Sequence, residues 1–368
     1  MRLSINSFYI FGLLFFTFGF GTVAAQCNGH ADLCNRRYDE VAYLTTHNAF
    51  CAAQDNFLFP NQNFGLTQQL QDGVRGMMLD VYDENGTITV YHGTPLAGSA
   101  PFSSNLAEIK NFLDANPNEI VTLIIQCGIT ANDMESELTA AGLMSRVYTK
   151  PTGGQWATLQ QMIDDDERIV ILSDCNDAGP TQAWYHYIWD HAFETDWDNN
   201  DTTDFSCAVN RGDSAHSLFV LNHFNTTPVI GTGDPQRAAI ANANPYFFNR
   251  AMKCQIANNR LPNFPTVDFY EIGDGMEVVD MLNGVFVGAA EAHQNENGGL
   301  SIWPQPVANG QILHVRFETP VNGPLNITIY SLLGESLHQA SGLTGQEITL
   351  PIPPLSAGIY LLEVQTSD

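Results

Sequence analysis

The amino-acid sequence predicts an α/β protein, a TIM-type β/α barrel followed by a small C-terminal β-sandwich. Short runs rich in Val, Ile and Leu are apolar on both faces, as in the strands of a parallel sheet that is covered on both sides. Helical patterns or loops separate most of these runs. About eight such units fit into roughly 250 residues, which is the number and size expected of a β/α barrel.

The predicted barrel strands follow from these runs, taken in order along the chain. They lie at residues 41–46, 77–82, 88–91, 120–125, 169–173, 218–222 and 265–269, and one more is expected near 185–189. The helical patterns between them lie at residues 66–72, 104–115, 134–141 and 158–164.

Residues 1–25 are predicted to be a secretory signal peptide. A basic residue, Arg2, precedes an apolar stretch from Phe8 to about Val23, and small residues follow before Gln26. A membrane anchor is the alternative, but the stretch is short, contains glycines and has no basic cluster after it. No later segment is apolar enough to span a membrane.

The barrel is predicted to occupy residues 26–292, after which the character of the sequence changes. Residues 293–299, HQNENGG, are expected to be a linker. Residues 300–368 contain alternating strand patterns separated by Gly, Pro and Asn turns, at 312–317, 325–330, 347–350 and 358–364. This pattern indicates a separate β-sandwich.

The charge of the chain limits its partners. Fourteen basic and 40 acidic residues give a formal net charge of −26. This charge repels nucleic acids and anionic membrane surfaces, and it leaves carboxylates for divalent cations. A saline or extracellular setting explains the composition equally well. We expect no nucleic-acid partner and no stable membrane span.

The seven cysteines are interpreted as structural. Seven is an odd number, so at least one thiol stays unpaired within an exported chain. Cys27 and Cys34 are close enough in the sequence for a local disulfide at the new N-terminus. Two longer pairings, Cys127–Cys175 and Cys207–Cys254, are also expected. No Cys/His spacing suggests a zinc site.

Polar side chains stand at the ends of three neighbouring predicted strands. His47 and Asn48 end the first strand in YLTTHNAF, Asp80 lies near the end of the second, and His92 ends the third in ITVYHG. The carboxyl ends of barrel strands face one shared pocket. Two imidazoles and a carboxylate are therefore expected in a single site.

This set of side chains suits the cleavage of a phosphodiester. One imidazole can take the proton from an attacking hydroxyl while the other protonates the leaving oxygen. Histidine titrates near neutral pH, so the two rings can hold opposite protonation states at the same pH. The charge that grows on the phosphoryl oxygens requires an arginine, a metal ion or both.

Five ordered segments resemble the phosphatidylinositol-specific phospholipase C X-domain superfamily, in particular its extracellular X-domain-like members. They are YLTTHNAF, GVRGMMLDVYDENGTITVYHG, NPNEIVTLIIQ, CAVNRGDSAHSLFVLNHF and LPNFPTVDFYEIGDGMEVVDMLN, within residues 36–285. The resemblance implies that His47 is the general base acting on the inositol 2-hydroxyl and that His92 is the general acid protonating the diacylglycerol oxygen. It also implies that Asp268 orients His47.

The same resemblance raises the question of calcium. Asn48 and Asp80 match calcium ligands of the metal-dependent members, whereas metal-independent members have aspartate and arginine there. Met78 and Gln126 stand where two further carboxylates are expected. Such an incomplete shell binds calcium weakly, is completed by substrate phosphate and water, or is not used. Calcium is the one candidate cofactor, and no organic cofactor is expected.

Three polar residues are predicted to contact the substrate. Arg211 suits the geometry of a phosphate, and Asn222 and Gln126 stand at strand ends. Asn210 with Arg211, or Asn222 with His223, could line the rim of the pocket.

Other conspicuous residues have structural interpretations. Arg75 is more simply explained as stabilising the bottom of the barrel, and Asp174 and Asp177 as capping the next segment. The aromatic segment at residues 184–198 indicates core packing with a solvated acidic edge, rather than a sugar or lipid platform.

The C-terminal region carries a second resemblance. LSIWPQPVANGQILHVRF, NITIYSLLGESL and PLSAGIYLLEV are similar to the C-terminal sorting domain of type IX secretion cargo in Bacteroidota. The resemblance implies passage through the outer membrane of a Gram-negative cell, with the type IX machinery as a partner and an extracellular or cell-surface location. A carbohydrate-binding or adhesive module is the alternative.

The sequence thus predicts a secreted phosphoric diester hydrolase or lyase. Its expected substrate is a phospholipid, above all an inositol phospholipid or a relative, or a soluble phosphodiester, cleaved through a cyclic phosphate. One alternative is a weakly active or inactive surface or binding protein on the same barrel. Another is a phosphodiesterase for a different glycerophospholipid or a sphingolipid.

Overall fold

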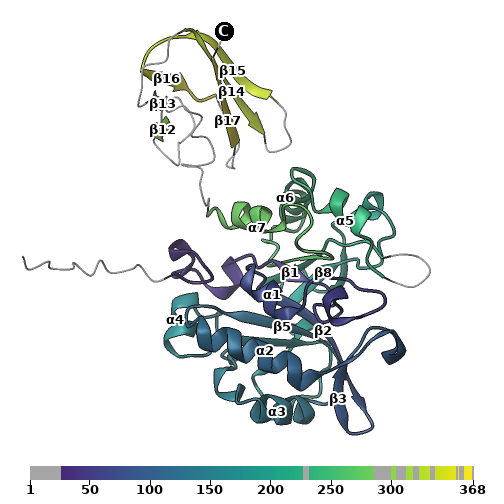
Figure 1. Cartoon of the computed structure of the whole chain (residues 1–368). Coiled ribbons are helices and arrows are strands. Elements are labelled where there is room, and N and C mark those ends of the chain that lie inside the picture. The colour runs from purple at the N-terminus through teal and green to yellow at the C-terminus, as the bar shows by residue number, and fades with distance from the viewer. Residues whose placement is uncertain are drawn as a thin grey trace, which may run out of the picture.

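The structure is a computed structural model of the 368-residue chain. It describes residues 26–226, 232–285, 300–303, 312–317, 323–331, 336–353, 355 and 360–366. The predicted signal peptide and the predicted linker lie outside these residues. Figure 1 shows the N-terminal α/β part and the C-terminal strands.

The α/β part is built around a curled parallel sheet. Its eight parallel strands run in the order β7-β6-β5-β2-β1-β11-β10-β8. They are β1 (Thr45–Thr46), β2 (Gly76–Glu84), β5 (Val121–Gly128), β6 (Ile169–Ser173), β7 (Tyr185–Tyr187), β8 (Ala192–Thr195), β10 (Leu218–Asn222) and β11 (Phe264–Val267). No hydrogen-bonded ladder joins β7 to β8 among the described strands, so the barrel is open there. The predicted β/α barrel is confirmed in this open form.

Three shorter strands are attached to this sheet. They are β3 (Thr87–Val90), β4 (Ala100–Pro101) and β9 (Val209–Gly212). β3 runs antiparallel to β2, with Glu84 opposite Thr87, and β4 runs antiparallel to β3. The prediction that residues 88–91 form a barrel strand is therefore wrong, because the chain turns back on β2 through a hairpin. The eighth parallel strand is instead β8, which the sequence patterns did not reveal.

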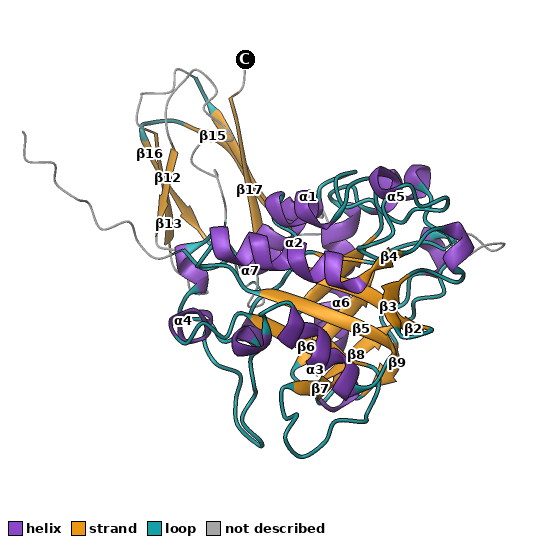
Figure 2. Cartoon of the chain, turned by 60° about the horizontal axis from the view of Figure 1, so that its bottom comes forward, coloured by secondary structure: helices purple, strands orange, loops and turns teal. Residues whose placement is uncertain are grey.

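Helices cover the outside of the sheet (Figure 2). They are α1 (Leu66–Gln71), α2 (Phe102–Ala115), α3 (Ala131–Ala140), α4 (Leu159–Asp164), α5 (Pro235–Ala241), α6 (Tyr246–Asn258) and α7 (Gly275–Asn283). In α2 the buried residues Phe102, Leu106 and Ile109 recur at helical spacing and form one apolar face. Neighbouring helices pack in pairs, α1 with α2 and α6 with α7.

The parallel strands are buried on both faces, as the sequence patterns predicted. All five residues of β6 are buried. Ile171 belongs to the core cluster that includes helix residues such as Leu106, whereas its neighbour Leu172 belongs to a second cluster with Tyr38 and Trp156. Successive side chains of a strand point to opposite faces, so these clusters are the cores on the two sides of the sheet.

All three predicted disulfides are present. They link Cys27 with Cys34, Cys127 with Cys175, and Cys207 with Cys254. The remaining thiol, Cys51, is unpaired and buried.

The C-terminal region is a β-sandwich, as predicted. One antiparallel sheet contains β12 (Leu300–Trp303), β13 (Ile312–Phe317) and β16 (Glu347–Pro351), and the other contains β14 (Leu325–Ser331), β15 (Ser336–Leu343) and β17 (Tyr360–Thr366). Val315 and Leu350 from the first sheet pack with Ile327 from the second in one core. β12 and β15 were not among the predicted strands. No helix in the described part of the chain has the length and apolarity needed to cross a membrane.

Candidate active site

His47 is positioned by the register of two neighbouring strands. Thr46 of β1 pairs with Val267 of β11, so the next residues, His47 and Asp268, lie side by side at the carboxyl ends of these strands. His47 Nδ1 donates to Asp268 Oδ1 at 2.9 Å. A carboxylate only accepts hydrogen bonds, so the Nδ1 of a neutral ring carries the proton and Nε2 has the lone pair. The contact expected between Asp268 and His47 is present.

Phe224 holds the plane of the His47 ring. It follows β10 by two residues and stacks on the imidazole with ring centroids 3.9 Å apart and an interplanar angle of 8°. Phe224 is buried. The sequence carried no signal for Phe224, because an aromatic side chain after a strand is far more often an ordinary core residue.

His92 enters the site from the hairpin instead of from a barrel strand. Its Nδ1 lies 3.2 Å from Asp80 Oδ2 and 3.1 Å from Asn48 Nδ2. A protonated ring donates its Nδ1–H to Asp80, whereas a neutral ring with a bare Nδ1 accepts from Asn48. When the ring is charged and bonded to Asp80, Nε2 carries the second proton.

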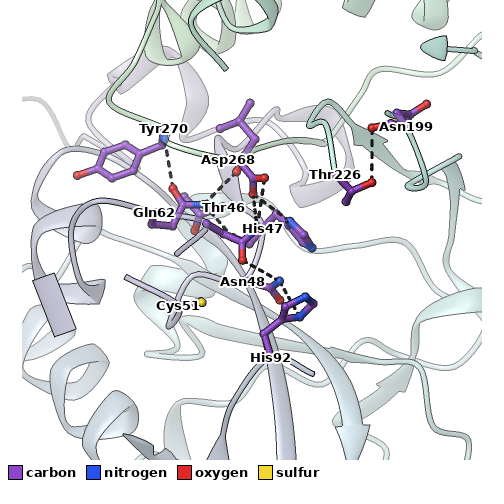
Figure 3. Close-up of polar contacts among 12 residues, drawn as sticks. Thr46, His47, Asn48, Cys51, Gln62, His92, Asn199, Thr226, Asp268 and Tyr270 are labelled. Carbon is purple, nitrogen blue, oxygen red and sulfur yellow. Dashed lines mark hydrogen bonds and ion pairs between the residues drawn. The ribbon is translucent and has the colours of Figure 1, made fainter. Parts of the chain in front are cut away.

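The two imidazoles meet as the sequence predicted. Their centroids are 6.4 Å apart, and the planes are inclined at 76°. In Figure 3 the rings of His47 and His92 lie on either side of Asn48. The prediction that His92 ends a barrel strand was wrong. The two rings and both carboxylates nevertheless lie together in one site.

A buried amide connects the two histidine–carboxylate pairs. Asn61 donates to Asp268 Oδ1 at 3.2 Å and accepts from Asn48 Nδ2 at 3.2 Å. The neighbouring Gln62 donates to the backbone oxygen of His47 at 2.8 Å, and its own oxygen accepts from the Tyr270 amide (Figure 3). Both amides lie in a loop where Asn and Gln are common, so the sequence carried no signal for them.

The site opens into a cavity of about 530 Å³. Its lining includes His47, His92 and the three residues predicted to contact substrate, Arg211, Asn222 and Gln126. This volume is within the range of about 300–1,000 Å³ that is typical of small-molecule sites.

A buried glutamate organises the wall of this cavity. Glu194 of β8 is 3% exposed and accepts from Arg211 Nε at 2.5 Å and from Asn222 Nδ2 at 3.0 Å. The Arg211 guanidinium also lies over the ring of Trp189, 4.6 Å from its centroid. Glu194 was not predicted, because the strand that carries it was missed.

Two further acids follow the sheet nearby. Asp174 lines the cavity and accepts from the Cys127 amide at 2.9 Å. Burial raises the pKa of Asp174 above its usual value. Asp177 accepts from the Ala131 amide at the start of α3, an earlier element of the chain and not the following segment that it was expected to cap.

Several other candidates lie outside this cavity. His223 is buried, donates from Nε2 to the Ala241 oxygen at 2.8 Å and accepts at Nδ1 from Arg250 at 2.8 Å. Arg75 donates to Glu119 and to two backbone oxygens at the amino end of β2, consistent with its predicted role in the barrel bottom.

The aromatic segment at residues 184–198 has two roles. Trp184 and Tyr185 are core residues, as expected. Trp189 and Trp197, however, line the cavity, so the prediction of core packing holds for only part of the segment.

The residues around Asp80 can be compared with the requirements of calcium, which takes about six to eight oxygen ligands. Asn48 uses its amide nitrogen for His92 and Asn61, and Asp80 uses one carboxylate oxygen for His92. The Met78 side chain, which lines the same cavity, offers a thioether in place of an oxygen. These described residues do not fit a protein-held calcium shell. Calcium stays a prediction.

Known families and proteins resemble this chain over most of its length. The sequence matches the PI-PLC X family over residues 33–283 and the secretion system C-terminal sorting domain over residues 301–368. A PI-PLC X domain-containing protein of Arabidopsis thaliana is 31% identical over 277 residues, which cover 67% of this chain and 62% of that protein. PI-PLC X domain-containing protein 1 of Arthroderma benhamiae is 26% identical over 277 residues, which cover 70% of this chain and 90% of that protein.

A solved phosphatidylinositol-specific phospholipase C from Staphylococcus aureus is similar at 15% identity with a TM-score of 0.46, covering 67% of this chain and 94% of that one. The sorting domain directs secretion through the outer membrane by the type IX machinery, and the three disulfides fit an extracellular location. The family match extends over most of the chain. This protein therefore belongs to the PI-PLC X family and carries a C-terminal secretion sorting domain.

Proposed function

We propose that this protein is a secreted phosphoric diester hydrolase or lyase in which His47 and His92 form the acid–base pair. The observation that supports this most directly is the pairing of each imidazole with a carboxylate, with 6.4 Å between the ring centroids at the edge of the large cavity. This spacing leaves room for a phosphate group within hydrogen-bond reach of both rings.

The proposed reaction begins with a substrate hydroxyl that neighbours the phosphate. His47 Nε2 takes the proton of this hydroxyl as its oxygen forms a new bond to phosphorus. The bond from phosphorus to the leaving oxygen breaks, and His92 Nε2 gives its proton to that oxygen. The products are a cyclic phosphodiester and an alcohol. Water can then open the cyclic product, with the two imidazoles in exchanged roles.

Other side chains of the site are assigned supporting roles. Asp268 stabilises the positive charge that forms on His47, and Asp80 does the same for protonated His92. Arg211, held by Glu194, contacts the phosphoryl oxygens or the headgroup. An inositol phospholipid or a related ester supplies the neighbouring hydroxyl, and Asn222 and Gln126 contact its headgroup.

The test is the release of soluble phosphoinositol by the native protein and by His47→Ala and His92→Ala. Each substitution is expected to lower kcat by about 10²- to 10⁴-fold, which is the usual contribution of one general acid or base. His30→Ala is the matched control, because His30 also pairs with an aspartate, Asp280 at 3.2 Å, but does not line the cavity.

The enzyme assignment fails if the native protein and both variants show the same background on every phosphodiester tested. Choline or ethanolamine phosphate as the only product would instead assign the activity to another class of lipid. Cyclic inositol phosphate as the first product supports attack by the neighbouring hydroxyl.

A further inference from the structure

A second cavity shares His92 with the active site. It has a volume of about 350 Å³, and its lining consists of Cys51, Phe57, Phe59, His92, Gly93, Thr94, Ala97 and Thr232. Among the described lining residues, His92 is the only one that the two cavities share, whereas His47 lines the larger cavity alone. The His92 side chain therefore forms part of the wall of both cavities.

Two loops build this smaller cavity. One carries Phe57 and Phe59, and the other contains the short helix η4 (Pro95–Ala97). Leu58 donates its backbone N–H to the oxygen of Ala97 at 2.8 Å and so joins the loops. Gly98 has φ +132°, and a Cβ atom there would lie 2.6 Å from the Phe57 ring. Only glycine allows this conformation and this close approach, so the position of the Phe57 ring depends on it.

The two cavities differ in the charged groups that line them. The larger one has apolar side chains but also Asp80, Asp174, Glu194, Asp198 and Arg211 as well as the histidines. The described lining of the smaller one has two aromatic rings, a thiol, the hydroxyls of Thr94 and Thr232 and small side chains, and His92 is its only side chain that can carry charge near neutral pH. Burial raises the pKa of the Cys51 thiol to about 12, so this group is neutral.

The apolar character continues outward from the smaller cavity. Leu58 and Leu96, each next in sequence to a lining residue, are 67% and 90% exposed, and Phe59 is 42% exposed. Exposed large apolar side chains that adjoin one another mark a contact for an apolar ligand more often than scattered ones do.

The chemistry requires the acid and the base to serve opposite ends of the reacting group. In an in-line displacement at phosphorus, the attacking and leaving oxygens lie on opposite sides. The attacking hydroxyl belongs to the headgroup and must be next to His47, in the larger cavity with its charged side chains. The leaving oxygen must be next to His92, and so the alcohol that carries it extends to the other side of that ring.

We propose that the smaller cavity binds the apolar alcohol released from the phosphate, a glyceride whose ester groups contact Phe57, Phe59 and Ala97. This inference rests on the proposed function. The cavity is at the lower end of the usual range of ligand sites, about 300–1,000 Å³. It can hold the glycerol unit and the first carbons of its acyl chains, and longer chains continue past Leu58 and Leu96.

The experiment fills the cavity and leaves the catalytic residues unchanged. Ala97→Trp places a large ring in the cavity, and Ile256→Trp adds the same ring at an exposed position of α6 that lines neither cavity. Both variants, with Ala97→Leu as a smaller step, are assayed on three substrates. These are phosphatidylinositol with two hexanoyl chains, the methyl ester of inositol phosphate, and cyclic inositol phosphate, which has no separate leaving alcohol.

We expect Ala97→Trp to lower kcat/KM for the dihexanoyl substrate at least 10-fold, with a smaller loss for Ala97→Leu. Activity on the methyl ester and the cyclic phosphate should stay within 2-fold of native, as should all activities of Ile256→Trp. The inference is overturned if Ala97→Trp cleaves the dihexanoyl substrate at the native rate, or if it loses activity on all three substrates equally while its thermal unfolding matches that of Ile256→Trp.

Binding of dihexanoylglycerol, measured by calorimetry, separates this inference from the proposed function. The native protein and Ile256→Trp should bind it, and Ala97→Trp should bind it at least 10-fold more weakly. If no substrate is turned over but this binding pattern is found, the proposed function fails and the apolar-alcohol site stands. If turnover is found but all three proteins bind the glyceride alike, the site fails and the proposed function stands.

Discussion

Asp80 has two alternative roles in the site, as the partner of His92 or as a ligand of calcium. Its carboxylate contacts His92 Nδ1, as Asp268 contacts His47 Nδ1, so the two histidines have matched partners. The same carboxylate is the one acid that the sequence offered for calcium. As the partner of His92, Asp80 stabilises the charged ring by a hydrogen bond. A metal ion that bound the same carboxylate oxygen would break this hydrogen bond.

Replacement of Asp80 separates these roles. A hydrogen bond to a charged group is typically worth about 1.5–3 kcal/mol, so Asp80→Asn should lower kcat by roughly 10- to 150-fold. We expect that a chelator leaves the activity of the native protein unchanged and that added calcium does not restore the variant. Abolition of native activity by the chelator, with recovery on adding calcium, would show that Asp80 acts as a metal ligand.

At the residue scale, the sequence revealed the groups that do the proposed chemistry but not those that hold them. His47 and Asp268 were predictable because each follows a strand of clear pattern, and their strands are neighbours. Phe224, Asn61 and Glu194 were not predictable. Their roles depend on loops and on a short strand that come together only in the folded chain.

The β2–β3 hairpin is the element at which the sequence prediction went wrong. Asn85 and Gly86, the two residues between the strands, both have positive φ values, 55° and 86°. Asn-Gly in a two-residue loop between alternating strands is a strong hairpin signal, and it was present in the sequence. The hairpin brings His92 back beside Asp80 of β2, whereas a barrel strand would have placed it after a helical crossover.

The disulfide between Cys127 and Cys175 ties two elements together at the rim of the cavity. It links the end of β5 to the segment after β6 across 48 residues, whereas Cys27–Cys34 spans only 7. The entropy lost by the unfolded chain grows with the length of the closed loop, to about 4 kcal/mol for the longer and about 2 kcal/mol for the shorter one.

Paired serine substitutions should therefore differ in their effect. Cys127→Ser with Cys175→Ser is expected to lower the free energy of unfolding by about 2 kcal/mol more than Cys27→Ser with Cys34→Ser. Urea unfolding of both double variants under oxidising conditions measures this difference. An equal loss in the two, or a larger loss at the N-terminal pair, contradicts the expectation.

For the whole molecule, two distinct hydrophobic patterns made the architecture predictable. Runs that are apolar on both faces gave way to alternating runs after residue 292, and the structure has a two-sided core in one part and a single sandwich core in the other. The opening between β7 and β8 could not be predicted. Both strands are short, with three and four residues, and tertiary packing decides what such strands pair with.

The buried histidines outside the site should make the whole molecule sensitive to mild acid. Burial lowers the pKa of His186 and of His191 to about 4, and burial together with Arg250 holds the pKa of His223 well below its usual value. These rings are neutral in the folded protein at pH 5.5, whereas histidines of the unfolded chain, with a pKa of about 6.5, are mostly protonated there. The unfolded state thus binds more protons, and stability must fall as the pH drops below about 6.5.

For His186 and His223, the two most deeply buried of these residues, the loss between pH 7.5 and pH 5.5 should be about 1.4 kcal/mol each. Urea unfolding of the native protein at the two pH values measures the total. In His223→Gln, which keeps a donor for the Ala241 oxygen, the difference between the two pH values should shrink by about 1.4 kcal/mol even though the variant is less stable at both. Carboxyl groups titrate alike in the two proteins and cancel in this comparison. A pH dependence that is the same in the variant and the native protein would mean that His223 takes up its proton within the folded state.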